Sequence, residues 1–493
     1  MLTTSFSIMD YLVFGLLLII SSLIGVYFWF KSLNNTSNDE FLTGKRQLSA
    51  FPVCMSLVAS FMSTNTLLGL PAEVFLSGTQ ISAQIISFII AIVLSAEIFM
   101  PIYYRLDILS VNQIPYVAVV LYGPALALSS VTPLSISSSI LMVGAICTFY
   151  TSIGGIKAVI WTDVLQFILM ILGVLMVIIQ GALEVGGFQE MWNINQKGGR
   201  VIFFNTDVNV YKNDNLLNVI IGTTIIWSAN YCCLQTQVQR YCSLGSIQKA
   251  RRTLYWNLPL LILISLLAVM SGMAIFAKYH DCDPITLGYV QRPDQLMPYF
   301  VMDTLSQYPG LAGLFVACVF SGSLSTLSSG FNSLAAITWE DIIKHRIKCQ
   351  DDRHALKITK LIAGSYGLIA IALAFIVGNA GTVFQASISL VGSMVGPLFA
   401  LFTLGVLYPY ATAPFILVFL MGISCTGSLI GFISGIICGL FLSIGSLLHP
   451  KPKVSLPTTT DNCPPDVVKD VYLKSMAFPN SSYISTYDNP EYR

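Results

Sequence analysis

Long apolar runs follow one another along the chain, and they constrain its fold more than any other feature. Each interior run is about 20 residues or longer, which is the length a helix needs to cross a bilayer. Lipid permits such runs to be helices, because a helix satisfies its own backbone hydrogen bonds. We predict an all-α, polytopic membrane protein of about 12 spans, at residues 8–30, 50–76, 79–104, 108–130, 134–155, 159–183, 215–239, 253–279, 309–340, 356–378, 382–409 and 413–448.

Composition supports this class and excludes others. Only 10% of the residues are charged, whereas about 25% is usual in soluble proteins. The net charge is +1 and no basic stripe is present, which argues against nucleic acid as a partner. The sequence shows no catalytic constellation, nucleotide motif, CxxC or Cys/His zinc spacing. We therefore expect a protein that is not an enzyme and that binds no cofactor. Its expected surroundings are the lipid bilayer, and the sequence identifies no protein partner.

The positions of Lys and Arg predict the orientation. If the N-terminus is outside, most of the 25 basic residues fall in inner loops, as the positive-inside rule requires. The C-terminal tail, residues 450–493, then lies outside as well and is expected to be polar and mobile. Cys282 and Cys463 share that oxidising side and are disulfide candidates, although the sequence does not fix their geometry. Asn480 heads a glycosylation sequon on the same side.

The run at 309–340 has an unusually polar centre. At helical spacing Gly322, Ser325, Thr326, Ser329 and Ser333 share one face. No water is available at that depth, so each hydroxyl needs a partner inside the protein. Two interpretations stay open: a packing seam of small residues, or a site of hydroxyl and carbonyl oxygens that suits sodium.

The run at 50–76 is polar at mid-span and continues with Gly69 and Pro71. Proline removes a backbone donor and disfavours helical geometry just before it, so we expect this helix to break. A break near the bilayer midplane leaves carbonyl groups and a helix terminus exposed, and transporters use both to hold substrate and ions. A merely kinked helix is the alternative.

Three further places carry polar groups at risk of burial. Asp163 is either a functional acid or a residue at the water interface. Trp227 precedes the polar run 235–240, which is either part of a site or a helix end that reaches cytoplasmic water. Gln385 lies in a span that contains Gly396-Pro397, and it belongs either to a second breakable span or to a helix–helix hydrogen bond.

Several stretches resemble the sodium:solute symporter family, in the branch of the monocarboxylate, multivitamin and iodide transporters. The motifs are long and gap-free, and the resemblance extends to about residue 450. They are FLTGKRQLSAFPVCMSLVASFMSTNTLLGLPAEV (41–74), CTFYTSIGGIKAVIWTDVLQ (147–166), QTQVQRY (235–241), HDCDP (280–284), PDQLMPY (293–299) and PGLAGLFVACVFSGSLSTLSSGFNSLAAITWED (309–341).

The resemblance implies a LeuT-type fold of two inverted five-helix repeats with one helix added before them. The transmembrane domain would cover residues 1–449, with the extra helix at 8–30 and a last span at about 413–448. Repeat one would occupy about 50–183 and repeat two about 215–409, and the tail 450–493 would follow.

The resemblance also implies the site. The main sodium site of the family joins the first repeat helix to the eighth, and Asp163 matches an acid near the sodium exit path. The implied sodium ligands are the carbonyl oxygens of Ala59, Met62 and Gly322 and the hydroxyls of Ser325 and Thr326. The implied substrate cavity is formed by Ser63, Thr66, Tyr116, Trp227, Phe384, Gln385 and Ile388.

The function implied is sodium-coupled import of a small organic anion, such as lactate, pyruvate or a short-chain fatty acid, across the plasma membrane. Multivitamin or iodide transport is the alternative within the family. An ion channel would show a ring of charges or a carbonyl filter, and neither is visible.

The chain departs from the family pattern at four places, so a transport-deficient variant is a further alternative. The segment between Asp107 and Pro115 is shorter than in relatives, residues 412–425 resemble an insertion, and Leu234-Gln235 replaces Asn-Gln. The sequence also stops at Arg493, before a final helix of relatives.

Overall fold

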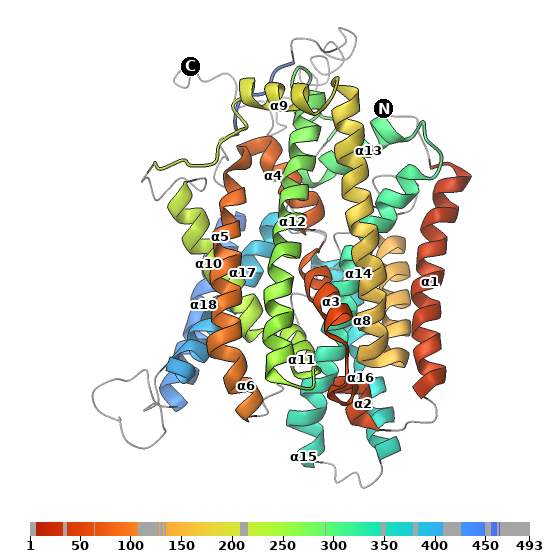
Figure 1. The fold of residues 1–493 in the computed structure, drawn as a ribbon, viewed down its shortest axis with the longest axis vertical. Helices are drawn as coiled ribbons and strands as arrows, with labels where there is room; N and C mark the ends of the chain where they lie inside the picture. The colour runs from red at the N-terminus through yellow and green to blue at the C-terminus, as the bar shows by residue number, and fades with distance from the viewer. Residues whose placement is uncertain are drawn as a thin grey trace.

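The computed structural model describes residues 6–32, 37–63, 65–106, 128, 132, 135–207, 215–290, 292–346, 352–377, 383–407, 425–448, 455–460 and 463. Every regular element in these residues is a helix, and the long helices run roughly along the longest axis of the molecule (Figure 1). Seven of the described helices are long and apolar enough to cross a membrane, or eight if one bent pair counts as a span. The expected all-α, multi-pass class is confirmed.

The helices of the first half have the following bounds: α1 (Ile8–Ser32), α2 (Asn38–Thr43), α3 (Ala50–Phe61), α4 (Leu70–Ser77), α5 (Gln84–Leu94), α6 (Met100–Leu106), α8 (Ile136–Glu184) and α9 (Phe188–Lys197). Those of the second half are α10 (Leu216–Cys233), α11 (Gln235–Cys242), α12 (Ile247–Tyr279), α13 (Leu296–Leu305), α14 (Leu311–Ile337), α15 (Lys344–Arg346), α16 (Asp352–Val377), α17 (Val383–Leu407) and α18 (Cys425–Leu448). Most of the shortened segment 108–130 and of the insertion 412–425 lies outside the described residues.

The first helix of each expected repeat is interrupted. α3 ends at Phe61, Met62 leaves the helical conformation with ψ 62°, and the π-helical turn η2 (Asn65–Gly69) leads into α4. The segments 50–61 and 66–77 form an angle of 60°, so the expected break is confirmed. It lies directly after Phe61 and not beside Gly69 or Pro71, which belong to helical turns. In the second repeat α10 ends at Cys233, Leu234 takes an extended conformation with ψ 126°, and α11 follows. The span expected at 215–239 therefore consists of two helices that are separated at Leu234.

The 49-residue element α8 contains a change of direction at Gly155, where the sequence predicts two spans to meet. Gly155 has φ 63°, a conformation that side chains rarely tolerate. An added Cβ would also lie 2.6 Å from a ring carbon of Phe41. Glycine is therefore required here, both for the backbone and for the close approach of α2.

The polar-centred helix α14 is the centre of the bundle. Its membrane-length window is 89% buried, whereas the other candidate spans range from 28% to 67%. It packs against α8, α1, α3 and α16. The exposed face of α1 is apolar, as a lipid-facing helix requires. The candidate site on α14 is thus surrounded by protein.

Candidate functional site

The last turn of α3 lies against the middle of α14. Gly322 approaches Met62 so closely that an added Cβ would collide with the Met62 carbonyl oxygen. One turn further along α14, the Thr326 hydroxyl lies 3.0 Å from the Ser60 carbonyl oxygen and 3.1 Å from that of Gly322. Gly322 therefore allows α3 and α14 to pack closely. The same close approach of the two helices brings backbone and side-chain oxygens together.

The residues expected to bind sodium lie at this crossing. Ala59, Met62, Ser325 and Thr326 are all buried. The Ser60 hydroxyl, which the sequence did not single out as a ligand, lies 3.5 Å from the Ser325 hydroxyl. The structure thus brings together the two segments that carry the expected ligands, and the role of each oxygen in holding sodium remains a prediction.

A buried ion pair lies beside the crossing. Arg240 Nη2 of α11 is 2.8 Å from Asp163 Oδ2 of α8, and the two side chains are 2% and 0% exposed. A single buried charge is costly, so each residue offsets the burial of the other. The alternatives that Asp163 meets water at the interface and that the run 235–240 ends in cytoplasmic water are both wrong, because all of these side chains are buried.

Arg240 connects the ion pair to the hydroxyls of the crossing. Its Nη2 donates to Ser60 Oγ at 2.7 Å and to Ser329 Oγ, while Ser56 Oγ donates to Asp163 Oδ2 at 2.5 Å. Helices α3, α8, α11 and α14 therefore share one hydrogen-bond network. Sequence reasoning missed Arg240, and the available signal was an arginine at the end of a polar run with no acidic residue nearby in sequence.

The neighbouring residue Gln239 extends the network toward α2. Gln239 Nε2 donates to the Leu42 carbonyl oxygen at 2.6 Å, and Gln239 Oε1 accepts from the Ser333 hydroxyl at 3.1 Å. These bonds hold α11 against both α2 and α14. α11 begins directly after the extended residue Leu234, and all of its side chains are buried.

At the interruption in the first helix, polar side chains lie next to a cluster of aromatic rings. Ser63 is buried, and the Thr66 hydroxyl donates to the Phe61 carbonyl oxygen at 3.2 Å. The Trp227 ring packs edge-on against Phe61 at 5.3 Å and Phe88 at 4.7 Å between centroids. Three of the expected substrate residues, Ser63, Thr66 and Trp227, thus come from elements that meet at the break.

The other expected substrate residues are only partly placed. Helix α17 carries positions 384, 385 and 388 and contacts both η2 and α10. The side chains of Phe384, Gln385 and Ile388 lie outside the described part, as do all atoms of Tyr116.

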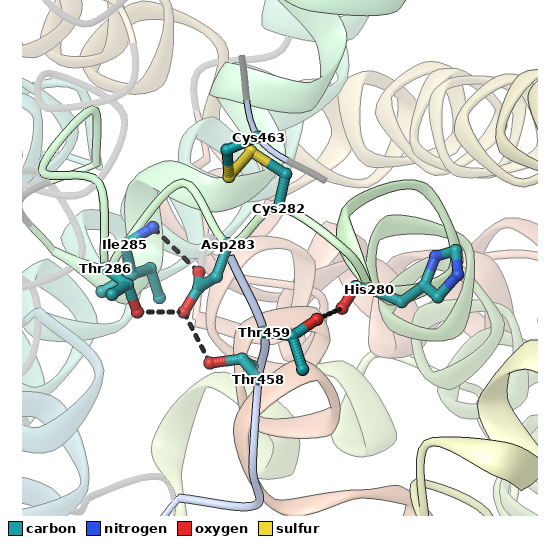
Figure 2. Close-up of a disulfide and its surroundings, with 8 residues drawn as sticks. All are labelled: His280, Cys282, Asp283, Ile285, Thr286, Thr458, Thr459 and Cys463. Carbon is teal, nitrogen blue, oxygen red and sulfur yellow. Dashed lines mark hydrogen bonds between the residues drawn. A yellow bond between two sulfur atoms is a disulfide. The ribbon is translucent and has the colours of Figure 1, made fainter. Parts of the chain in front are cut away.

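Cys282, which follows α12, and Cys463 of the C-terminal tail form a disulfide with a Cα–Cα distance of 5.0 Å (Figure 2). Asn480 lies outside the described residues.

The ligand chemistry of the crossing suits a monovalent cation. Its oxygens belong to carbonyls and hydroxyls, and Arg240 already compensates the nearby carboxylate. Sites for Ca²⁺ typically use several carboxylates. Among the described residues, no group of three or more His, Cys, Asp or Glu side chains is placed to hold a metal ion.

Interrupted helices that meet around buried polar groups are typical of secondary transporters. Comparison with known proteins gives the family of this chain. The model of the "Sodium:solute symporter family" matches residues 41–116 and 108–421, and the chain belongs to this family. It is therefore a multi-pass membrane transporter that couples solute movement to sodium, and not an enzyme.

Relatives cover nearly the whole chain. Human sodium-coupled monocarboxylate transporter 1 is 39% identical, in an alignment that covers 93% of this chain and 77% of that protein. Mouse sodium-coupled monocarboxylate transporter 2 is 38% identical, and the alignment covers 93% of this chain and 76% of that protein. A putative sodium-dependent multivitamin transporter of Drosophila melanogaster is 36% identical, and the alignment covers 95% of this chain and 80% of that protein.

The fold is shared with a solved structure, a sodium-coupled sialic acid symporter in a substrate-bound, outward-open state. The TM-score is 0.74 at 24% identity, and the match covers 89% of this chain and 98% of that one. The expected LeuT-type bundle is thereby confirmed.

Proposed function

We propose that the protein imports small monocarboxylates, such as lactate, pyruvate or short-chain fatty acids, together with sodium across the plasma membrane. The observation that carries this proposal is the convergence of main-chain and hydroxyl oxygens at the α3–α14 crossing, directly beside the break in the first helix. The sodium-coupled monocarboxylate transporters among the relatives, at 38% to 39% identity, supply the substrate class.

Sodium would bind at the α3–α14 crossing. The proposed ligands are the carbonyl oxygens of Ala59, Met62 and Gly322 and the hydroxyls of Ser325 and Thr326. Sodium at this place touches both helices and so favours the arrangement in which they are close. Asp163, held by Arg240, lies next to this site and would guide sodium toward the cytoplasm.

The substrate would bind at the break in the first helix. Its carboxylate would meet the hydroxyls of Ser63 and Thr66 and the N-terminal end of the outer half-helix, where the helix dipole favours a negative charge. Its apolar end would face the aromatic rings of Phe61 and Trp227. Bound sodium supplies the remaining compensation. The proposed cavity is completed by Tyr116, Phe384, Gln385 and Ile388.

The coupling follows from differential binding. Each sodium ion that enters an inside-negative cell gains about 2.3 kcal/mol per 100 mV, in addition to its concentration gradient. Sodium favours the substrate-competent state, and linkage requires that substrate tightens sodium binding by the same factor. No metal other than sodium and no cofactor enters this scheme.

The proposed orientation places both termini outside the cell. The disulfide between Cys282 and Cys463 supports it, because disulfides persist on the oxidising side of a membrane. In this orientation Asn480 would be available for glycosylation.

The decisive experiment is transport by the full chain in oocytes after surface delivery has been verified. Uptake of labelled lactate, butyrate, biotin and iodide is measured with currents, first in sodium and then in choline. Labelled uptake is needed because one sodium ion moving with one monocarboxylate carries no net charge. Saturable, sodium-dependent uptake of lactate and butyrate is expected.

Other outcomes would overturn the proposal in different ways. Uptake of biotin or iodide alone would make the protein a vitamin or iodide transporter. Flux without saturation would indicate a channel. Absence of both uptake and current, with the protein present at the cell surface, would indicate a transport-deficient member of the family.

A further inference from the structure

Helix α9 is a short helix that follows α8, and it lies crosswise over one end of the bundle (Figure 1). The turn before it is tight, because the Gly187 N–H donates to the Ala182 carbonyl oxygen at 2.7 Å. Gly186 and Gly187 both have positive φ, which glycine adopts without strain. The chain thus turns from α8 directly into α9, so the first turn of α9 lies at the level at which α8 ends.

One face of α9 packs on the protein. Met191 and Asn195 are buried, and a spacing of four residues places them on the same face. Asn195 Nδ2 donates to the Met273 carbonyl oxygen of α12 at 2.9 Å, and Met191 belongs to a small apolar cluster with Ala274 of α12. These contacts fix the orientation of α9 on the end of the bundle.

Two exposed aromatic side chains lie beside this packed face. Phe188 is 52% exposed and Trp192 is 41% exposed, and they lie one turn apart on the same side of α9. At 3.6 residues per turn they fall between the packed face and a polar side. The residues of the polar side are Gln189, Glu190, Asn193, Gln196 and Lys197. α9 therefore presents its exposed rings next to the face that packs on the bundle, and its polar residues away from that face.

The end of α8 locates the boundary of the hydrocarbon layer. Leu172, Ile179 and Leu183 lie on one exposed face of α8, and Leu183 is 67% exposed. Exposed apolar side chains on a membrane-spanning helix face lipid. The next residue, Glu184, forms an ion pair of 2.5 Å with Lys278 of α12, and both charged side chains are partly exposed. Charges exposed to hydrocarbon are costly, so the hydrocarbon layer ends between Leu183 and Glu184.

α9 lies at the level of the lipid headgroups. It begins four residues after Glu184 and runs across the bundle rather than away from it. Tryptophan is enriched at this level, because its ring is apolar and its N–H can bond to water or headgroups. A helix in the interface buries its apolar face about 5–10 Å into the boundary between headgroups and acyl chains. The position and the sidedness of α9 both fit such a helix.

We propose that α9 is an interfacial anchor, whose Phe188 and Trp192 side chains insert between the lipid headgroups of the leaflet at this end of the molecule. In the orientation proposed above, this is the outer leaflet. The partner is lipid and not a second protein, because the two rings lie at the level at which the lipid-facing surface of α8 ends. Interfacial anchors set the tilt and depth of a bundle, and the Asn195–Met273 hydrogen bond transmits this restraint to α12.

The test measures depth in the bilayer by spin labelling. Phe188→Cys and Trp192→Cys report on the two rings, and Glu190→Cys and Lys197→Cys report on the polar side of the same helix. Each full-length variant is labelled with a nitroxide and reconstituted in phosphatidylcholine vesicles, and the parent chain treated in the same way gives the background. Collisions with oxygen, which concentrates in lipid, are compared with collisions with a water-soluble nickel chelate. The ratio of oxygen to nickel collisions is expected to be several-fold higher at positions 188 and 192 than at 190 and 197.

Leu172→Cys, on the lipid-facing side of α8, gives the reference for the hydrocarbon layer. Equal ratios at all four positions of α9 would overturn the proposal, because the two rings would then lie in water like the polar side. Low collision rates with both reagents at positions 188 and 192 would also overturn it, because a protein and not lipid would then cover the rings.

A second measurement uses the native ring. The chain has six tryptophans, so the fluorescence of Trp192 is obtained as the difference between the parent chain and Trp192→Phe. Lipids brominated on the acyl chain close to the headgroup are expected to quench this difference strongly, and aqueous iodide only weakly. Strong quenching by iodide and none by brominated lipid would contradict the proposal. Neither measurement requires transport, so a failure of the proposed function leaves both results interpretable.

Discussion

Arg240 and Asp163 set the charge of the candidate site. Both are buried, and their shared hydrogen bonds reach Ser60 and Ser329 on the two helices that form the crossing. Because the pair is neutral as a whole, the neighbouring oxygens present partial negative charge without a net anion. In such an environment the cost of desolvation is lower for a monovalent cation than for a divalent one.

Removing one member of this pair should be far more damaging than removing both. Asp163→Asn or Arg240→Gln leaves a buried, unpaired charge, which costs about 3–5 kcal/mol of stability. The double variant Asp163→Asn with Arg240→Gln should recover a large part of that loss. The measurement is the unfolding midpoint of the purified protein together with surface delivery. Lys278→Gln serves as control, because its pair with Glu184 is partly exposed and worth about 1 kcal/mol or less. Single variants as stable as the double one would contradict the assignment.

Thr326 offers a test of one proposed sodium ligand. Thr326→Ala removes an oxygen that lies between the Ser60 and Gly322 carbonyl groups, so the sodium concentration for half-maximal uptake should rise about tenfold. Thr326→Ser keeps the hydroxyl and should stay close to the original protein. Uptake is measured against sodium concentration at saturating substrate. An unchanged apparent sodium affinity in Thr326→Ala would show that this hydroxyl is not a ligand.

At the scale of elements, the sequence predicts those helix breaks and polar faces that depend on neighbouring residues in the chain. A break in the first helix could be predicted from its polar mid-span and proline, although it lies at Met62 and not next to Pro71. The polar face of α14 follows from helical spacing. The break at Leu234 carries no glycine or proline, so it depends on tertiary contacts of α11 that no local pattern reveals. Arg240 was missed for a related reason, because a basic residue after an apolar run ordinarily marks an inner loop.

The joint in α8 provides an element-scale prediction. Gly155→Ala introduces a side chain at φ 63° and 2.6 Å from the Phe41 ring, so α2 or α8 must shift. The expected loss of stability is about 1–3 kcal/mol, with reduced surface delivery. Gly364→Ala is the matched control: it lies in α16 with nothing within 4 Å of an added Cβ, and alanine is the better helix former. Thermal unfolding of both variants decides the matter, and equal midpoints would argue that the joint tolerates a side chain.

At the scale of the whole molecule, the proposed sodium ligands lie on α3 and α14, which the expected repeat boundaries place in the first and the second repeat. An ion at their crossing is therefore bound only when the two halves are correctly placed. The ion pair and the Gln239 bonds hold α11 and α2 to the same centre. Occupancy of one small site can thus bias the arrangement of the whole bundle.

This coupling should be visible in thermal stability without any transport. A ligand that binds only the folded protein stabilises it by about 1.4 kcal/mol at ten times its dissociation constant. Replacing choline by sodium should therefore raise the unfolding midpoint of the purified protein, and Thr326→Ala should weaken that rise. Lactate should add a further increase in sodium but little in choline, since linkage makes each ligand tighten the other. If lactate stabilised equally in both salts, substrate binding would be independent of sodium, and the two halves would not be coupled through the α3–α14 crossing.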